Sequence, residues 1–582
     1  MGQGAFRHRI FRCSQSDYYH NEIADASVVH TSARLAAIAE AGFTGVWLRA
    51  ELRELAPVRL FGKYASNSKA QLQSLRTLCR RAGKYGLGIW LYFNEPLGIP
   101  QSHRFWRDQP TLGGPCVYTP LDAPVIALCP STHEVQDYLR EGFRELYGQI
   151  PLAGAILITA SEHPSHCWSY VVNNPSCSWR ETFWAERCEC PRCAPRGPVE
   201  VVADVIGLIH HGIKSARPEA EVVAWDWSWN MYCRPPYRNM IDRLPEDVIL
   251  MGDFERGGVV SRAAKRETVE EYSLVYPGPS KRFVSEIAAT AGRRQMWARI
   301  QINTTLELST VPNLPLVVSL YRKFKYLQST EVCGFMGTWN FSSATDTLNV
   351  FAATKLSEER LDDDEQKCLQ LLAEEYFGPG VDAPEVVRAW YGFQRACRHY
   401  PINGNAFVYR SPTSRALAYP LRLRFSGRAM PWTYNPDLLG DHLEDSLGDF
   451  SLSQVVQLLG RLSRAWLRAL KHYEKGLVSA DRTERARKEL GVATVAGRCF
   501  QATYNIYRWY RSRRNKESRK LSKFEYEIVA DEIENLRAAL PSVESDLRLG
   551  FHEESHQYTF TAGMMREKLR VLEKLMRRQR YV

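Results

Sequence analysis

The sequence predicts an α/β protein, a (β/α)8 TIM barrel followed by a mainly helical C-terminal domain. Up to about residue 355, short β-rich runs alternate with helical stretches, which is typical of repeated βα units. There are eight such runs, the number that closes a barrel. Beyond that point strands largely stop and 3.6-residue periodicity takes over. We therefore place the barrel at residues 1–355 and the helical domain at 356–582.

The barrel elements follow from local patterns of apolar, β-branched and aromatic residues. The predicted strands are 44–50, 86–93, 125–129, 153–159, 221–227, 247–254, 296–302 and 332–339. The predicted helices between them are 32–41, 71–85, 133–147, 199–216, 281–291 and 315–327. The run at 153–159 counts as the fourth strand.

The C-terminal domain is predicted from amphipathic periodicity. Its expected helices are 358–376, 384–399, 452–473, 483–511, 523–540 and 561–578. Between them, residues 407–449 are rich in proline, glycine and aromatic residues, so we expect an extended loop there. Long loops in compact domains are often functional, and we expect this one near the barrel mouth.

Composition excludes several classes of protein. Hydrophobic residues are 45% and charged residues 24%, which excludes a disordered or collagenous chain. There is no apolar run of about 18 residues, so no membrane partner is expected. The start of the chain lacks an apolar signal region, which favours a cytoplasmic protein. The net charge of +11 comes without a nucleic-acid-reading module, so we expect no nucleic-acid partner. The oligomeric state stays open, with a homodimer among the options.

Polar residues gather where the predicted strands end, which is where barrel enzymes place their catalytic groups. The neighbouring tryptophans would suit the faces of sugars. Neither a Cys–His pair nor a phosphate-binding glycine loop accompanies them, and glycosidic hydrolysis needs carboxyl groups. These observations indicate an oligosaccharide or glycoconjugate substrate. The exit residues considered as binders are Arg49, Asn94, His163, Asp226, Trp227 and Asp253.

Glu162 is the preferred general acid. It follows the apolar run AILIT, so a rigid strand would deliver its side chain to the mouth. His163 beside it could tune the pKa of the carboxyl group, as catalysis near neutral pH requires. The alternative is a structural ion pair with an arginine such as Arg49.

The second catalytic group stays open. Glu307 and Glu255 also follow predicted strands, as do Asp226 and Asp253. Each of these carboxylates, taken alone, is more typical of a sugar-hydroxyl binder or a structural acceptor than of a nucleophile.

Two segments, ALCPSTHEVQDYLREGFRELY and GAILITASEHPSHCW, resemble the barrel of the β-N-acetylhexosaminidase superfamily, glycoside hydrolase families 20 and 123. The resemblance covers about residues 40–345. It implies that Glu162 is the acid/base and that Arg49 binds sugar hydroxyls. It also implies that Trp339 and Trp297 contribute to an aromatic wall around the acetamido group.

Ser161 departs from the family pattern, in which an aspartate at this position orients the substrate's own 2-acetamido nucleophile. A serine hydroxyl cannot offset the positive charge of an oxazolinium intermediate. Either Asp226, Asp253 or Glu255 supplies that charge, or the reaction uses a protein nucleophile or an activated water.

A cysteine-rich loop is predicted at 163–197. Cys188, Cys190 and Cys193 form a CxCxxC run containing a Cys-Pro turn, with Cys167 and Cys177 nearby. This spacing favours a closed structural zinc site made by Cys167, Cys188, Cys190 and Cys193, with Cys177 as an alternative fourth ligand. A disulfide or free thiols are the other interpretations. No cofactor is expected for catalysis itself.

Taken together, the sequence favours an exo-acting β-N-acetylhexosaminidase-like glycosidase that releases a terminal β-linked N-acetylgalactosamine or N-acetylglucosamine. A second interpretation is a retaining β-glycosidase acting on a sugar without an acetamido group, with Glu307 or Glu255 as nucleophile. A third is a barrel that binds carbohydrate without cleaving it.

Overall fold

The structure is a computed structural model of the chain. It describes residues 6–12, 22–56, 58–65, 67–117, 124–159, 164–169, 188–227, 229–303, 306–339, 344–358, 360–431, 440–478, 483–518 and 520–578.

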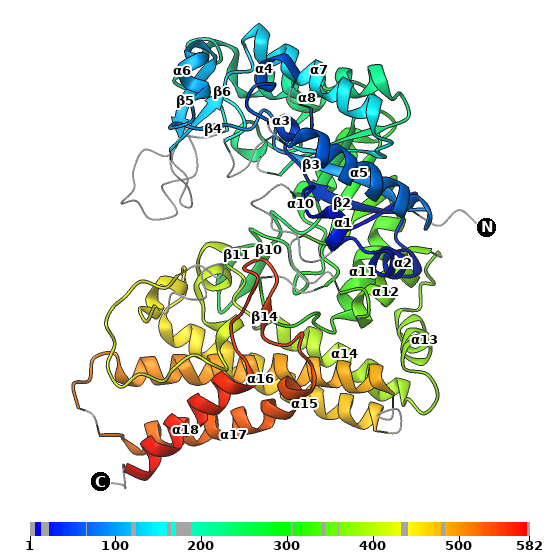
Figure 1. Cartoon of the computed structure of the whole chain (residues 1–582). Helices are drawn as coiled ribbons and strands as arrows, with labels where there is room; N and C mark the ends of the chain where they lie inside the picture. The colour runs from blue at the N-terminus through cyan, green and yellow to red at the C-terminus, as the bar shows by residue number, and fades with distance from the viewer. Residues whose placement is uncertain are drawn as a thin grey trace.

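Eight parallel strands close into a barrel, so the predicted fold class is confirmed (Figure 1). Around the barrel the order is β1, β13, β12, β9, β8, β7, β3 and β2, and each strand pairs in parallel with both neighbours. The strands are β1 (His8–Arg12), β2 (Gly45–Arg49), β3 (Gly88–Phe93), β7 (Gly154–Ile158), β8 (Glu221–Trp225), β9 (Ile249–Asp253), β12 (Met296–Arg299) and β13 (Val332–Met336).

The structure corrects the predicted set of barrel strands at two points. The run predicted at 125–129 is not in the barrel: β6 (Val125–Leu128) pairs antiparallel with β4 (Ile99–Pro100) and β5 (Gly113–Val117) in a separate sheet. The barrel instead closes through β1, which the sequence analysis missed. One false strand and one missed strand leave the number of barrel strands before β7 unchanged, so β7 remains the fourth barrel strand along the chain.

Helices surround the barrel strands. The longer ones are α2 (Ser32–Glu40), α5 (Ser68–Gly83), α7 (His133–Gln149), α8 (Gly197–Ala216), α10 (Lys281–Thr290), α11 (Val317–Gln328) and α12 (Leu348–Glu358). The shorter ones are α1 (Ala26–Val29), α3 (Leu52–Leu55), α4 (Val58–Phe61), α6 (Phe105–Asp108) and α9 (Arg238–Ile241). A hairpin of β10 (Val259–Arg262) and β11 (Lys265–Thr268) lies between β9 and α10.

Large indoles fill the N-terminal half of the barrel interior. The rings of Trp90 and Trp297 meet edge to face with centroids 5.0 Å apart. A Cβ added at Gly45 would lie 2.8 Å from Trp90 Nε1, and one at Gly334 would lie 2.7 Å from Trp297 Nε1. These glycines are therefore required by close packing, because a methyl group would occupy the space that the indoles fill.

The C-terminal helices form a layer below the barrel (Figure 1). Along the chain, α14 (Ala383–Cys397) packs on α15 (Leu452–Leu477), α15 on α16 (Glu484–Arg513), α16 on α17 (Lys523–Ser545), and α17 on α18 (Ala562–Arg578). Capping boxes begin α15 at Ser451 and α17 at Ser522, so hydrogen bonds satisfy the first amides of both helices. The other elements of this part are α13 (Glu365–Phe377), β14 (Phe551–His552) and β15 (Gln557–Tyr558). Among these and the other described helices, none is both long enough and apolar enough to cross a membrane.

A buried carboxylate connects the barrel to this helical layer. Glu489 on α16 accepts hydrogen bonds from Asn313 Nδ2 at 3.0 Å and from the backbone N–H of Leu348 at 3.0 Å. It also accepts one from the Tyr376 hydroxyl at 3.2 Å. These partners belong to the chain after β12, to α12 and to α13, so the two parts share polar as well as apolar contacts.

Candidate functional site

Five aromatic side chains form a cluster near the C-terminal end of the barrel, with Trp339 at its centre. Trp47 stacks on Trp339 at 5.0 Å, while Trp225 and Tyr92 meet it edge to face at 5.2 and 5.5 Å. Tyr272 lies 6.2 Å from the same ring. Trp339 and Tyr272 are the most exposed members, at 8% and 7%. The five rings of this mouth aromatic cluster come from the strands near their C-terminal ends and from the segments that follow them, and all five are buried.

Polar contacts fix the orientation of these rings. Trp47 Nε1 donates to the carbonyl of Thr338 at 3.3 Å, and Trp225 Nε1 donates to Asp253 Oδ1 at 2.8 Å. The guanidinium carbon of Arg12 lies 4.1 Å from the centroid of the Trp47 ring, a cation–π contact. The cluster is therefore held in place from several strands, as a preorganised binding site requires.

The ends of β8 and β9 carry a buried network of carboxylates and guanidinium groups. Arg282 Nη2 lies 2.5 Å from Asp226 Oδ2 and 3.5 Å from Asp253 Oδ2, and Arg282 Nε donates to Glu286 at 3.0 Å. Arg256 adds a contact of 3.1 Å to Asp253. Burial raises the pKa of Asp226 and raises the pKa of Glu286 well above its usual range. The network fixes Asp253, which in turn orients the Trp225 indole.

Glu255 and Glu307 are both held by polar partners, whereas a carboxylate nucleophile needs to face the substrate. Glu255 is fully buried and pairs with Lys323 Nζ at 2.6 Å. Glu307 accepts hydrogen bonds from the Ser273 hydroxyl and from the backbone N–H of Leu274, the latter at 3.2 Å. Both carboxylates thus support the chain around the mouth, and neither enters our candidate site.

Three further predicted binders lie at or just after the ends of β2, β3 and β8. Arg49 is the buried last residue of β2, and its backbone N–H donates to Glu22 Oε2 at 2.6 Å. Asn94 Nδ2 donates to the hydroxyl of Tyr92 at 3.1 Å, which attaches it to the cluster directly. Trp227 is half-buried, and the guanidinium of Arg256 lies 4.7 Å from its ring centroid.

Trp297 lies elsewhere. It is the second residue of β12 and packs against Trp90 and against His8, the first residue of β1, at 5.0 Å in each case. This position is at the N-terminal end of the barrel, opposite the strand exits. Trp339 therefore belongs to the aromatic surface at the mouth, and Trp297 does not.

Ser161, Glu162 and His163 lie outside the described residues. The chain before them is firmly held, because Thr159 directly follows β7 and its hydroxyl accepts a hydrogen bond from Trp229 Nε1 at 3.3 Å. The carbonyl of Thr159 lies 2.5 Å from His166 Nε2. The ends of β7 and of the later described segment are therefore anchored to each other, on either side of Glu162.

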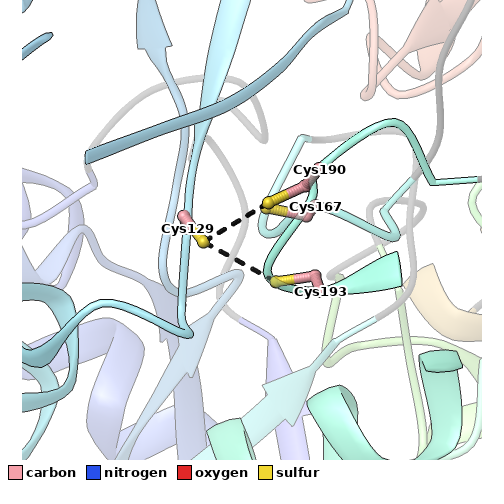
Figure 2. Close-up of side chains that lie close together, drawn as sticks. All are labelled: Cys129, Cys167, Cys190 and Cys193. Carbon is pink, nitrogen blue, oxygen red and sulfur yellow. Dashed lines mark hydrogen bonds between the residues drawn. The ribbon is translucent and has the colours of Figure 1, made fainter. Parts of the chain in front are cut away.

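Four buried cysteines form a compact group: Cys129, Cys167, Cys190 and Cys193 (Figure 2). Their Sγ atoms all lie within 4.8 Å of one another. Hydrogen bonding from the Cys167 thiol lowers the pKa of Cys129 and of Cys190, which favours thiolates at both. This group is the part of the described chain that could hold a soft metal ion.

The composition of the group differs from the predicted ligand set. Cys129 takes the place that the sequence analysis gave to Cys188, whose Sγ instead donates to the carbonyl of Cys167 at 3.1 Å. Cys177, the alternative ligand, lies outside the described residues. The sequence signal for Cys129 was the Cys129-Pro130 dipeptide, which repeats the Cys190-Pro191 turn 61 residues earlier.

Three members of the mouth aromatic cluster were also not predicted: Trp47, Trp225 and Tyr272. In the sequence, each of them resembles an ordinary core residue.

The fold is shared with solved glycoside hydrolases. One similar structure is a GH138 enzyme targeting pectin rhamnogalacturonan II, with a TM-score of 0.54 at 10% identity. That match covers 98% of this chain and 67% of the other. A family 89 glycoside hydrolase from Clostridium perfringens in complex with PUGNAc gives a TM-score of 0.54 at 11% identity. The match covers 98% of this chain, which spans only 59% of the Clostridium enzyme's length.

A looser match is the GH20 chitobiase of Flavobacterium johnsoniae, with a TM-score of 0.37 at 10% identity, covering 98% of this chain and 78% of the other. Neither a family model nor a curated protein matches the sequence.

Proposed function

We propose that the chain is a glycoside hydrolase that releases a terminal β-linked N-acetylgalactosamine or N-acetylglucosamine. The observation that carries the proposal is the mouth aromatic cluster, fixed at the strand exits of a barrel whose fold is shared with glycoside hydrolases. Aromatic faces stack on the apolar faces of sugar rings, and barrel enzymes act at this end.

The proposed roles follow from position. Glu162 donates a proton to the departing glycosidic oxygen, since it lies three residues beyond the anchored Thr159. Trp339 and Tyr272 offer the platform for the terminal sugar, because they are the most exposed rings of the cluster. Arg49 and Asn94 bind hydroxyl groups at the rim.

An acetamido sugar is favoured over other sugars by the structures of the family 89 enzyme. That protein was solved in complex with PUGNAc and with 2-acetamido-1,2-dideoxynojirimycin, the second at a TM-score of 0.55. The resemblance of the segment around Glu162 to the hexosaminidases supports the same sugar class. The ion pair of Glu255 and the backbone contacts of Glu307 weigh against a carboxylate nucleophile from either position.

A screen of p-nitrophenyl glycosides tests this proposal. The full chain should hydrolyse the β-GalNAc or β-GlcNAc compound faster than the α-anomers or sugars that lack the acetamido group. Inhibition by a thiazoline would assign the nucleophile to the substrate, whereas trapping by a 2-fluoro sugar would assign it to the protein. If every glycoside stays intact while calorimetry detects glycan binding, the protein binds carbohydrate without cleaving it.

A further inference from the structure

The four-cysteine group has the dimensions of a tetrahedral metal site. The Sγ atom of Cys129 lies 3.6 Å from that of Cys190 and 3.6 Å from that of Cys193, and the sulfurs point toward one another (Figure 2). Four sulfurs at about 2.3 Å from one zinc ion lie about 3.8 Å apart. A disulfide would require about 2.0 Å. The spacing thus matches four ligands around one ion.

A Cys-Pro turn occurs twice in the group, at Cys129-Pro130 and at Cys190-Pro191. Backbone hydrogen bonds close both turns: the N–H of Thr132 donates to the carbonyl of Cys129 at 3.2 Å, and the N–H of Ala194 donates to the carbonyl of Cys190 at 2.9 Å. The two turns bring their sulfurs to the group from opposite sides (Figure 2).

Charge around the group also suits a metal thiolate. Four thiolates and one divalent cation carry a net charge of about −2, which needs compensation inside the protein. Arg192 Nε lies 3.2 Å from the Cys129 sulfur and places a guanidinium charge beside it. Ser131 contacts the Cys193 sulfur at 3.2 Å and accepts a hydrogen bond from Arg196 at 2.9 Å. These contacts form the outer support that metal sites depend on.

We propose that Cys129, Cys167, Cys190 and Cys193 bind one structural Zn²⁺. Because all four positions are protein thiolates, the site is closed and has no place for substrate or water. The ion joins three distant pieces of chain: the end of β6, the segment 164–169 and the turn before α8.

The segment around Cys167 connects this site to the barrel mouth. Trp168 Nε1 donates to the carbonyl of Cys193 at 3.1 Å, and the carbonyl of Trp168 accepts from the Tyr232 hydroxyl at 2.6 Å. His166 contacts Thr159 at the end of β7. Zinc would therefore hold the chain that follows Glu162. This consequence for catalysis rests on the proposed function, whereas the metal site itself does not.

Metal analysis of the full chain and two serine variants tests the proposal. The wild type should contain about one zinc ion per chain, and Cys129→Ser should lose most of it to a competing chelator. Cys188→Ser is the matched control, because Cys188 is buried in the same loop but lies outside the four-sulfur group. It should keep about one zinc ion. Zinc loss from Cys188→Ser together with retention in Cys129→Ser would overturn the ligand assignment.

Cobalt substitution of the wild type keeps the proposal testable if Cys129→Ser fails to fold. We expect intense visible d–d bands and the sulfur-to-cobalt charge transfer of a tetrahedral thiolate site. Bound iron in place of zinc, a metal-free protein with reactive thiols, or disulfides in the denatured chain would each contradict the proposal. These readouts need no glycosidase activity, so they separate failure of the metal site from failure of the proposed function.

Discussion

Glu255 and Lys323 form an ion pair that is closed off from water on every side. Both side chains have no exposed surface, and Lys323 Nζ also donates to the carbonyls of Ser273 and Gln301. Burial lowers the pKa of Lys323, while the charge of Glu255 acts in the opposite direction. At the residue scale, this carboxylate is a structural partner of a lysine, which is one of the two roles that its sequence position favoured over that of a nucleophile.

Substituting Lys323→Met should lower the free energy of unfolding by about 3–5 kcal/mol, because it leaves the Glu255 charge buried without its partner. The double variant Lys323→Met/Glu255→Leu should recover part of that loss, since it removes both charges. Urea denaturation followed by circular dichroism measures both values.

Arg322→Met is the control on the same helix. Its ion pair with Glu365 is partly exposed, so its loss should change the free energy of unfolding by less than about 1 kcal/mol. Equal free energies of unfolding for the wild type and Lys323→Met would contradict the prediction, because the buried charge of Glu255 would then not need Lys323 as its partner.

From the sequence alone, single polar residues could be assigned to the end of a strand, but the residues that pair with them could not be identified. Glu255 follows β9 as predicted, yet Lys323, which neutralises it, lies 68 residues later on α11. Cys129 joins Cys190 and Cys193 across more than 60 residues. Such pairings depend on the tertiary fold, and local spacing carries no information about them.

At the scale of elements, the glycines of the barrel strands complement the indoles inside it. Gly154 on β7 lies opposite Trp90 on β3. A Cβ at this position would overlap both the Trp90 ring and the carbonyl oxygen of Glu221. The backbone atom cannot rotate away as a side chain could, so the strand must shift.

Gly154→Ala should therefore destabilise the protein by about 1–3 kcal/mol or more through overpacking. Gly207→Ala is the matched control, because Gly207 lies inside α8 and a Cβ there meets nothing within 4 Å. That control should instead stabilise the protein by about 0.5–1 kcal/mol through helix propensity. Thermal and urea unfolding of both variants measure these changes. A Gly154→Ala variant as stable as the wild type would contradict the packing explanation.

One missed strand and one strand assigned to the wrong sheet show which elements local sequence patterns cannot identify. β1 has the sequence HRIFR, whose charged residues argue against a buried strand until their partners are known. His8 pairs with Glu221 at 2.9 Å, more than 200 residues later, and Arg12 pairs with Glu22, which lies outside the strand. β6 is an apolar run like the barrel strands, and only its antiparallel partners distinguish it.

For the whole molecule, the order of elements sufficed to predict a barrel followed by helices. The alternation of strands and helices is repeated eight times, so one omission and one false strand did not change the class. The boundary predicted at 355/356 stays a prediction, and it falls within α12 (Leu348–Glu358). The mouth aromatic cluster could not be predicted in detail, because it combines residues from β2, β3, β8 and the segments after β9 and β13.

For the whole molecule, the central prediction is that one acidic side chain, Glu162, protonates the departing glycosidic oxygen. Glu162→Gln tests this most directly when kcat/KM is measured with two substrates that share a sugar and differ in leaving group. Glu141→Gln, an exposed position on α7, is the matched control and should retain full activity.

With a p-nitrophenyl or poorer leaving group, Glu162→Gln should lose at least about a hundredfold in kcat/KM while staying folded. With the 2,4-dinitrophenyl glycoside the loss should be far smaller, because that group departs without a proton. Near-normal turnover by Glu162→Gln, or equal losses on both substrates, would contradict its role as the general acid.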